Sequence, residues 1–527
     1  MTGQRYCPPP GLLLPPPNNA QPFTPTIKLE TTLKSNLWFN ETTIAIKASI
    51  GGTPAFEYAH QPGSKQISNL HDTKFRIASA TKLFTVLAVL LSRAQIGWED
   101  SITQFVPGLN DASYNDVTIG ALAGQTSGLG RFGYVGDLSL TPGFSTAQLG
   151  LPNSARQLPG CDAFPGGKPC SRDQVIAMFN DAAYAPTSPN SGPLYSNIAY
   201  NLLGMALEQV HSQSYEQAIQ ELIFDPIGMR NSSFDTPSNG SDAILPQAGD
   251  QWFAAPFGNF NPSGGIWSTP NDMLLFLEAL QTHKLLSPAQ TRKWLQPSSL
   301  LPSLQQLLGA PWEIFRPTDI DVAVPRPIDL YTKAGGVSGY SSHEVLVPEY
   351  GVALTIHAAG KYATMAVQNI LPLVAKPLIA HADEQARAQA TTKYVGTYRS
   401  AEGNSSITLA LDDGPGLKIE RAFMNGVAII PALAAVQGVN PSDASARLYP
   451  TGADSQGSEK ESWSIFINRM KIGEGRAFAE LDCASWNWGD AARYAGQPLD
   501  RIVFDMSQGK AVGVELVGWR TVLKKVE

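Results

Sequence analysis

The stretch Ser79-Ala80-Thr81-Lys82-Leu83-Phe84-Thr85-Val86-Leu87-Ala88-Val89-Leu90-Leu91 places a serine and a lysine where an apolar helix begins. Residues three apart on a helix lie on one face, so the nitrogen of Lys82 can reach the hydroxyl of Ser79. Burial or nearby positive charge lowers the pKa of a lysine enough for it to act as a base. The dipole of the first helical turn also favours a developing alkoxide. Ser79 is therefore a candidate nucleophile, and Lys82 is its candidate base.

The spacing of this pair is weakly specific by itself. The chain repeats it once, in Ser507-Gln508-Gly509-Lys510, just before the strand-like residues 511–516. Glycine after polar residues at that point predicts a hairpin turn, so Ser507 is expected to carry no chemistry. Ser79 needs support from other parts of the chain.

The composition predicts a folded chain with more than one domain. A length of 527 residues is too great for one ordinary hydrophobic core, so two domains are expected. The content of 43% hydrophobic and 16% charged residues is typical of globular proteins. The net charge of −7, without a basic stripe, argues against nucleic acid and membrane partners. The apolar run that ends at Leu91 is too short to span a bilayer. The oligomeric state is left open.

The N-terminus and the cysteines point to different compartments. The first residues lead into Pro8-Pro9-Pro10 and Pro15-Pro16-Pro17 without an apolar signal segment, which predicts a cytoplasmic protein unless an export signal has been removed. A disulfide could close the short loop between Cys161 and Cys170, and glycosylation sequons also suit secretion. The remaining cysteines are Cys7 and Cys483, and the sequons start at Asn40, Asn231, Asn239 and Asn404. The cysteine spacing fits no zinc pattern and the seven histidines are scattered, so no metal or cofactor is expected.

The order of the predicted elements indicates an α+β domain at residues 30–391, after a proline-rich arm at residues 1–29. Two strands, over 42–50 and 53–59, precede a helical middle, and strands over 329–333, 343–347 and 352–356 precede a closing helix over 363–381. This order predicts an antiparallel sheet that is assembled from both ends of the domain and flanked by helices.

Two further segments stand out by composition. Residues 130–171 are rich in glycine, proline and serine and are too long for an ordinary connection, so they form either an ordered lid or a floppy insertion. From Tyr394 onward, short alternating runs are separated by turn clusters such as Asp412-Asp413-Gly414-Pro415-Gly416. This pattern predicts an all-β domain, a barrel or a sandwich, at residues 392–527.

Two motifs downstream could complete a site around Ser79. Tyr195-Ser196-Asn197 follows a turn and precedes a helix, and a tyrosine beside two lysines has a lowered pKa. The alternative is a tyrosine packed on that helix, with Asn197 as its cap. In Lys333-Ala334-Gly335-Gly336, a strand lysine is followed by glycines that allow close approach of a substrate. An edge strand of this kind can donate an N–H group to an oxyanion; the alternative is a plain strand-to-turn transition.

In this order, the three motifs resemble those of the serine β-lactamase and penicillin-recognising family, in its branch of class C β-lactamases, family VIII esterases and D-aminopeptidases. The family signature is Ser-x-x-Lys, then Tyr-x-Asn, then Lys-Thr-Gly or a His-x-Gly variant. The likeness covers roughly residues 30–385 and includes the segments 125–129, 226–229 and 263–272. It implies the β-lactamase/transpeptidase-like fold.

The resemblance also implies the roles of the residues. Ser79 would attack a carbonyl, with Lys82 and Tyr195 relaying its proton. The N–H groups of Ser79 and Gly336 would bind the oxyanion. Asn197 would orient Lys82 and the substrate, and Lys333, beside Gly335 in the strand motif, would lower the pKa of Tyr195.

Ala334 argues against a β-lactam as the substrate. Family members that hydrolyse β-lactams usually carry a threonine there, and alanine cannot make its hydrogen bond to the carboxylate of the antibiotic. Gln125, where the family usually has histidine, is expected to be structural.

We therefore expect a serine hydrolase that acts on a small-molecule ester, lactone or thioester. One alternative is an acyltransferase on the same residues, as in fungal secondary-metabolism members of the family. The other is a non-catalytic member that only binds a ligand. An α/β-hydrolase is disfavoured because the chain has no Gly-x-Ser-x-Gly elbow.

Overall fold

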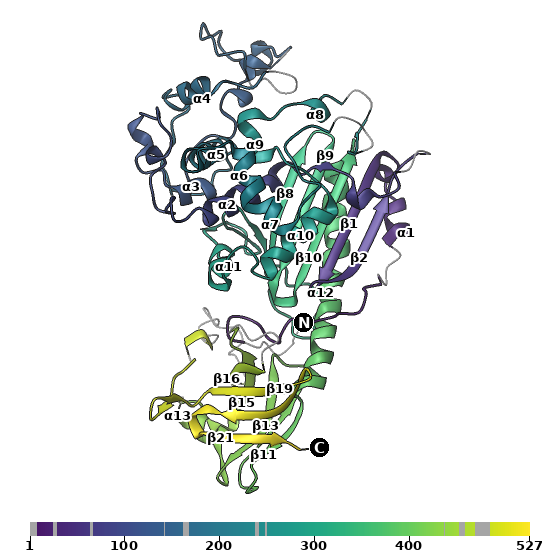
Figure 1. Cartoon of the computed structure of the whole chain (residues 1–527), viewed down its shortest axis with the longest axis vertical. Helices are drawn as coiled ribbons and strands as arrows, with labels where there is room; N and C mark the ends of the chain where they lie inside the picture. Colours follow the sequence, from purple (N-terminus) through teal and green to yellow (C-terminus); the bar gives the residue numbers. More distant parts are fainter. Residues whose placement is uncertain are drawn as a thin grey trace.

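The computed structural model describes residues 8–24, 29–63, 67–141, 143–161, 168–237, 242–247, 250–436, 438–452, 459–469, 485–487 and 489–526. Cys7, Cys483 and Asn239 lie outside these ranges. The described chain forms a larger domain with a sheet and most of the helices, and a smaller β domain. One long helix, α12 (Ala363–Tyr394), passes from the first to the second (Figure 1).

An eight-stranded antiparallel sheet forms the frame of the larger domain. Its strand order is β2-β1-β10-β9-β8-β7-β6-β5, so strands from the two ends of the domain are neighbours, as predicted. In this register Ile46 lies opposite Ile356 on β1 and β10. The strands are β1 (Thr42–Ile50), β2 (Thr53–His60), β5 (Ser299–Leu300), β6 (Gln306–Leu308), β7 (Glu313–Phe315), β8 (Leu330–Val337), β9 (Tyr340–Val347) and β10 (Val352–Gly360).

Helices cover both faces of this sheet. On one face, Val345 and Leu354 share a buried cluster with Ile370 of α12. On the other face, Leu346 and Ala353 join the core of the helical region. The helices before α12 are α1 (Leu29–Lys34), α2 (Thr81–Leu91), α3 (Ile119–Ala123), α4 (Arg172–Phe179), α5 (Ile198–His211), α6 (Tyr215–Ile219), α7 (Asp225–Ile227), α8 (Gln251–Ala254), α9 (Asn261–Gly264), α10 (Pro270–Gln281) and α11 (Pro288–Trp294). A two-stranded ribbon pairs β3 (Phe75–Arg76) with β4 (Trp267–Ser268).

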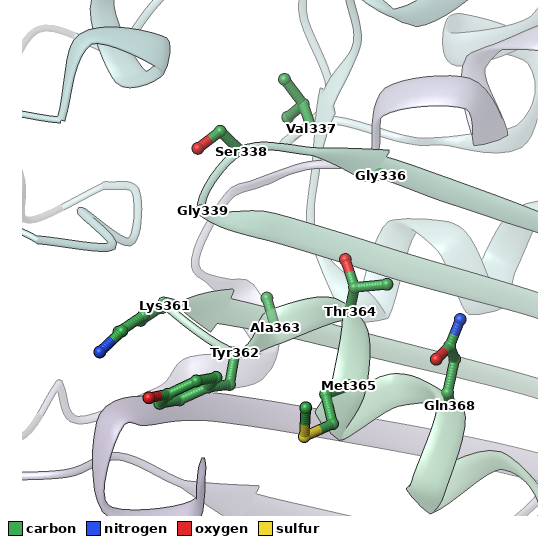
Figure 2. A pocket seen from close by; sticks show the side chains of 11 residues that line it. Gly336, Val337, Ser338, Gly339, Lys361, Tyr362, Ala363, Thr364, Met365 and Gln368 are labelled. Atoms are coloured by element: carbon green, nitrogen blue, oxygen red, sulfur yellow. The ribbon is translucent and has the colours of Figure 1, made fainter.

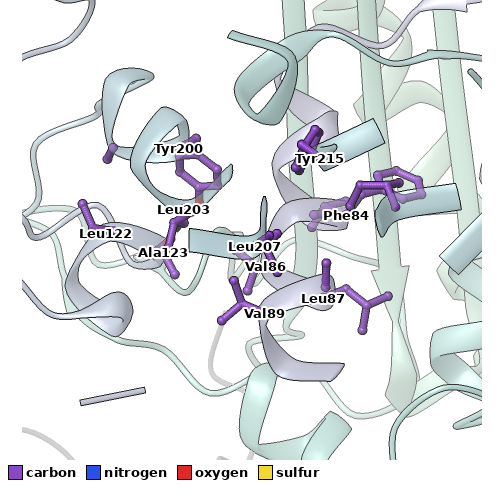
Figure 3. Close-up of a cluster of buried hydrophobic side chains, with 14 of the residues drawn as sticks. Phe84, Val86, Leu87, Val89, Leu122, Ala123, Tyr200, Leu203, Leu207 and Tyr215 are labelled. Carbon is purple, nitrogen blue, oxygen red and sulfur yellow. Dashed lines mark hydrogen bonds between the residues drawn. The ribbon is translucent and has the colours of Figure 1, made fainter. Parts of the chain in front are cut away.

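Helix α2, which begins two residues after Ser79, lies in the centre of the helical region. All its residues from Thr81 to Val89 are buried, and apart from two threonines and Lys82 they are apolar. Phe84 stacks on Phe276 of α10 with ring centroids 4.2 Å apart, and Figure 3 shows residues of α2 among those of α3 and α5. A fully buried leucine or phenylalanine contributes about 1.5–3 kcal/mol, so this helix has little freedom to move.

The smaller domain is a closed β-barrel. Its nine strands follow the order β12-β11-β21-β20-β19-β16-β15-β13-β14, and an additional pairing of β12 with β13 closes the sheet. The hairpin between β19 and β20 contains Ser507 opposite Lys510, which confirms the predicted turn. Its strands are β11 (Gly396–Arg399), β12 (Ser406–Ala410), β13 (Leu417–Met424), β14 (Val427–Ala428), β15 (Ala444–Pro450), β16 (Lys460–Arg469), β19 (Arg501–Ser507), β20 (Lys510–Leu516) and β21 (Thr521–Lys525). A ribbon of β17 (Arg493–Tyr494) and β18 (Gln497–Pro498) and the helix α13 (Ile429–Val436) complete it.

Helix α12 is longer than its pattern predicted, because it ends at Tyr394 and not near residue 381. Beyond residue 381, its buried side includes alanines at 382, 386 and 390. The helix ends at Tyr394, which lies in the core of the barrel. Small residues give a weak periodic signal, so this part was missed. By length and composition alone α12 could cross a membrane, but its apolar side packs on the sheet.

The described part of the N-terminal arm, residues 8–24, ties the two domains together. Leu14 belongs to the barrel core, and Leu13 contacts Val324 of the larger domain and Tyr449 of the barrel. The backbone N–H of Asn18 donates to Gln389 of α12 at 3.0 Å.

The glycine-rich insertion is attached at both ends of its described part. Cys161 and Cys170 form a disulfide, and both are buried in the main core. Tyr134 packs edge-on against Tyr184 with ring centroids 5.2 Å apart. The described residues of the insertion form three short 3₁₀ turns and are mostly exposed. Its function as a lid stays a prediction.

Candidate active site

Ser79 lies in the 3₁₀ turn Ala78–Ala80, immediately before α2, with its side chain beside Lys82. The Nζ atom of Lys82 lies 3.2 Å from Ser79 Oγ. It also donates hydrogen bonds to Asn197 Oδ1 at 2.7 Å and to the backbone oxygen of Ser263 at 2.6 Å. These two oxygen atoms can only accept hydrogen bonds, so they take two N–H groups of Lys82. The remaining position on the nitrogen faces Ser79, where Lys82 donates a hydrogen bond when it is protonated and can accept a proton when it is neutral.

Tyr195 contacts the same serine. Its hydroxyl lies 2.7 Å from Ser79 Oγ, so Ser79 contacts two groups that can exchange protons with it. Burial lowers the pKa of Lys82 to about 8. Burial alone would raise the pKa of Tyr195, but the charges of Lys82 and Lys333 outweigh it and lower the pKa to about 8. Both groups are therefore able to exchange a proton near neutral pH.

Lys333 supplies a fixed positive charge to this site. Its ammonium lies 5.5 Å from the ring centre of Tyr195 and donates to Glu313 Oε1 at 2.5 Å. Burial favours neutral Lys333, but Glu313 outweighs it and raises the pKa of Lys333. Burial likewise favours protonated Glu313, and Lys333 holds the pKa of that carboxyl below its usual range. The pair therefore stays ionised, and the lysine keeps its charge beside the tyrosine.

Strand β8 presents an open edge to Ser79, although it is an inner strand of the sheet. Strand β7 pairs with β8 only from Leu330 to Thr332. Among the described strands, the part of β8 after Thr332 therefore pairs only with β9. The N–H of Ala334 points across this open edge and donates to Glu313 Oε2 at 3.0 Å. The N–H groups of every second residue in a strand point to the same side, so the N–H of Gly336 points to the same side as that of Ala334. This orientation suits an oxyanion donor.

Gly335 allows β8 to lie against the turn that carries the serine. A Cβ atom at this position would lie 1.9 Å from the backbone oxygen of Ile77 and 2.6 Å from Ser342 Oγ. Ser342 in turn donates to the same Ile77 oxygen at 2.9 Å. The glycine therefore allows the close approach of the two segments, while Gly336 has open space on its side.

The tyrosine motif is held by backbone contacts with the segment around Gln125. The side chain of Gln125 accepts a hydrogen bond from the N–H of Ser196 at 2.5 Å, and its backbone oxygen accepts one from Leu194 at 2.7 Å. Gln125 itself has a φ of 63°. It touches the loop rather than the reacting atoms, which agrees with the structural role expected of it.

A cavity of about 670 Å³ lies next to Gly336. Figure 2 shows the tip of the β8–β9 hairpin on one side of it and the start of α12 on the other. Val337, Tyr362 and Met365 give it apolar walls, and Ser338, Thr364 and Gln368 supply polar groups. A cavity of this size accommodates a substantial organic group.

The structure thus brings together every candidate residue of the sequence analysis, and it adds three that were missed. Glu313 comes from the short strand β7, and Ser263 contributes only its backbone oxygen. Arg131 is the second residue of the insertion, and its guanidinium carbon lies 4.8 Å from the ring centre of Tyr195. None of these carries a local motif, although Ser263 falls in one of the matching segments. Among the described residues, no cluster of three or more His, Cys, Asp or Glu side chains could hold a metal ion.

Family models match both domains of the chain. The model of the β-lactamase family matches residues 44–376, and that of the β-lactamase-like C-terminal domain matches residues 386–527. A "Beta-lactamase-like protein" of Arthroderma benhamiae is 28% identical over 518 residues, which cover 90% of this chain and 86% of that protein. The "Probable hydrolase clz13" of Cochliobolus lunatus is 29% identical over 541 residues, with 92% and 85% covered.

Solved structures show the same fold. A D-stereospecific amidohydrolase from Streptomyces sp. matches with a TM-score of 0.50 and 18% identity, over 65% of this chain and 96% of that one. The octameric penicillin-binding protein homologue from Pyrococcus abyssi matches with a TM-score of 0.50 and 18% identity, over 94% and 99%.

Proposed function

Because the chain belongs to the β-lactamase family and is a hydrolase-type enzyme, we propose that it cleaves a small-molecule ester, lactone or thioester through an acyl-enzyme on Ser79. One observation carries this proposal: Ser79 Oγ lies 2.7 Å from the Tyr195 hydroxyl and 3.2 Å from Lys82 Nζ. The charges of Lys82 and Lys333 lower the pKa of Tyr195 to about 8, so Tyr195 can exchange its proton near neutral pH. This arrangement supplies a nucleophile with its base.

In the first half of the reaction, Ser79 Oγ attacks the substrate carbonyl while its proton moves to Tyr195 or Lys82. The oxyanion that forms accepts hydrogen bonds from the N–H groups of Ser79 and Gly336. Each such donor is worth about 2.7–4 kcal/mol of the barrier. The carbon–oxygen or carbon–sulfur bond then breaks, and the proton passes to the leaving group from Tyr195, or from Lys82 through Tyr195.

In the second half, water takes the place of the leaving group. The oxygen of the water attacks the acyl carbon while Tyr195 accepts a proton from the water. Tyr195 then gives this proton to Ser79 Oγ as the bond between Ser79 and the acyl group breaks. Asn197 and the backbone oxygen of Ser263 hold Lys82 in place through both steps by their bonds of 2.7 and 2.6 Å. The free enzyme is thereby regenerated.

Ala334 supports an ester-like substrate rather than a β-lactam. Ala334 offers a methyl group and an N–H that is engaged by Glu313, so the strand has no hydroxyl there for a carboxylate. The cavity beside Gly336 gives room for one part of the substrate, with apolar walls from Val337 and Met365.

The proposal is tested with 4-nitrophenyl acetate, butyrate and octanoate and with a chromogenic cephalosporin. We expect ester hydrolysis to exceed cephalosporin hydrolysis, and Ser79→Ala to lower kcat/KM by at least about a thousandfold. Ser507→Ala is the matched control, because it changes the other Ser-x-x-Lys serine, and it should stay within about twofold of the wild type. Full activity in Ser79→Ala, or a preference for the cephalosporin, would contradict the proposal.

A further inference from the structure

Arg131 carries a charge that the proposed mechanism does not use. Its guanidinium lies over one face of the Tyr195 ring, with its carbon 4.8 Å from the centroid, and the residue is exposed. Its own backbone is fixed, because its oxygen accepts the N–H of Asn197 at 2.8 Å. The cation is therefore anchored beside the reacting groups and open to solvent.

No carboxylate of the described chain contacts this guanidinium. Several other described arginines also lack an ion pair, but Arg131 lies over the ring of the tyrosine that contacts Ser79. A guanidinium offers five N–H donors in a planar fork that matches a carboxylate. On Arg131 this fork is available to a ligand.

The charges around the ring of Tyr195 are unbalanced. Lys82, Lys333 and Arg131 lie 5.1, 5.5 and 4.8 Å from its centroid. Glu313 is the carboxylate that pairs with one of them, Lys333. Below about pH 8, where Lys82 is charged and Tyr195 is neutral, these groups carry a net positive charge in a chain whose net charge is −7. A cleft of one sign concentrates ligands of the opposite sign.

From this juxtaposition we propose that Arg131 binds a carboxylate, or a similar anionic group, of the substrate while Ser79 attacks its carbonyl. The enzyme then selects anionic acyl substrates over neutral ones of the same shape. This inference rests on the proposed function, because it assigns the substrate class of that same site.

The test compares esters that differ only in charge. On the acyl side, mono-4-nitrophenyl glutarate is compared with 4-nitrophenyl 4-carbamoylbutanoate, in which a neutral amide replaces the carboxylate. On the leaving-group side, 4-carboxyphenyl valerate is compared with 4-carbamoylphenyl valerate. The wild type should prefer the anionic member of one pair by about ten- to a hundredfold in kcat/KM. The preference should fall as salt is added, since exposed charges are screened.

Three variants isolate the guanidinium. Arg131→Gln should lower kcat/KM for the preferred anionic ester at least about tenfold more than for its neutral partner, and Arg131→Lys should keep part of the preference. Lys293→Gln, which removes an exposed charge on α11, should leave the preference intact. The absence of a preference in the wild type, or an equal loss on both esters in Arg131→Gln, overturns the inference. If the wild type hydrolyses none of the four esters, both the proposed function and this inference fail. If it hydrolyses them without a preference for charge, only the inference fails.

Discussion

Replacing Gly335 with alanine tests the fit that places the nucleophile. The new Cβ atom would lie 1.9 Å from the backbone oxygen of Ile77, which is two residues before Ser79. Carbon and oxygen atoms that are not bonded need more than 3 Å, so β8 or the serine turn must move by about 1 Å. A displacement of 1 Å can cost about a hundredfold in rate, because reacting atoms must be aligned. Overpacking of this kind costs about 1–3 kcal/mol of folding free energy.

The assay measures kcat/KM with 4-nitrophenyl acetate, together with urea denaturation to separate rate from unfolding. We expect Gly335→Ala to lose about a hundredfold in kcat/KM while it remains folded. Gly192→Ala is the matched control, because a Cβ atom there also meets nothing within 4 Å and Gly192 has no role in the proposed mechanism. It should stay within about fivefold of the wild type. Full activity in Gly335→Ala, or equal losses in both variants, would refute the argument that this contact positions the serine.

Three other predictions follow from charges and from the disulfide. The activity of the wild type should rise with pH to a plateau above about 8, where Tyr195 is unprotonated. Lys333→Met should shift this rise to higher pH, because it removes a charge that lowers the pKa of Tyr195. The same pH profile in the variant and the wild type would contradict this. Glu313→Gln leaves a buried ammonium without its partner, so urea denaturation should show a loss of about 3–5 kcal/mol, and a Glu313→Leu, Lys333→Met double variant should recover most of it. Replacing Cys161 and Cys170 by alanine should change the ratio of octanoate to acetate hydrolysis at least about threefold; a loss of folding stability without a change in this ratio would argue against a lid.

The candidate residues could be predicted from the sequence because they lie in short local motifs. Ser79, Tyr195 and Lys333 each begin a pattern of three or four residues, and the order of the patterns carries the family likeness. The assembly of the sheet from both ends of the domain was predictable as well, since strands of high β propensity flank a helical middle.

What the sequence did not predict depends on contacts between distant segments. Glu313 is one acidic residue in a three-residue strand, and only the pairing of β7 with β8 brings it to Lys333. Arg131 lies in a segment without periodicity, and its position over Tyr195 follows from the hydrogen bond of its backbone to Asn197. The open edge of β8 also has no local signal, because it results from the shortness of its neighbour.

The central claim is that Ser79 forms the acyl-enzyme, and trapping that species tests it most directly. The protein is incubated with a 4-nitrophenyl alkylphosphonate, digested, and analysed by mass spectrometry. We predict one phosphonyl group per chain on the peptide that contains Ser79, and no adduct in Ser79→Ala. An adduct on another residue, or equal labelling of the Ser79→Ala variant, would contradict the account.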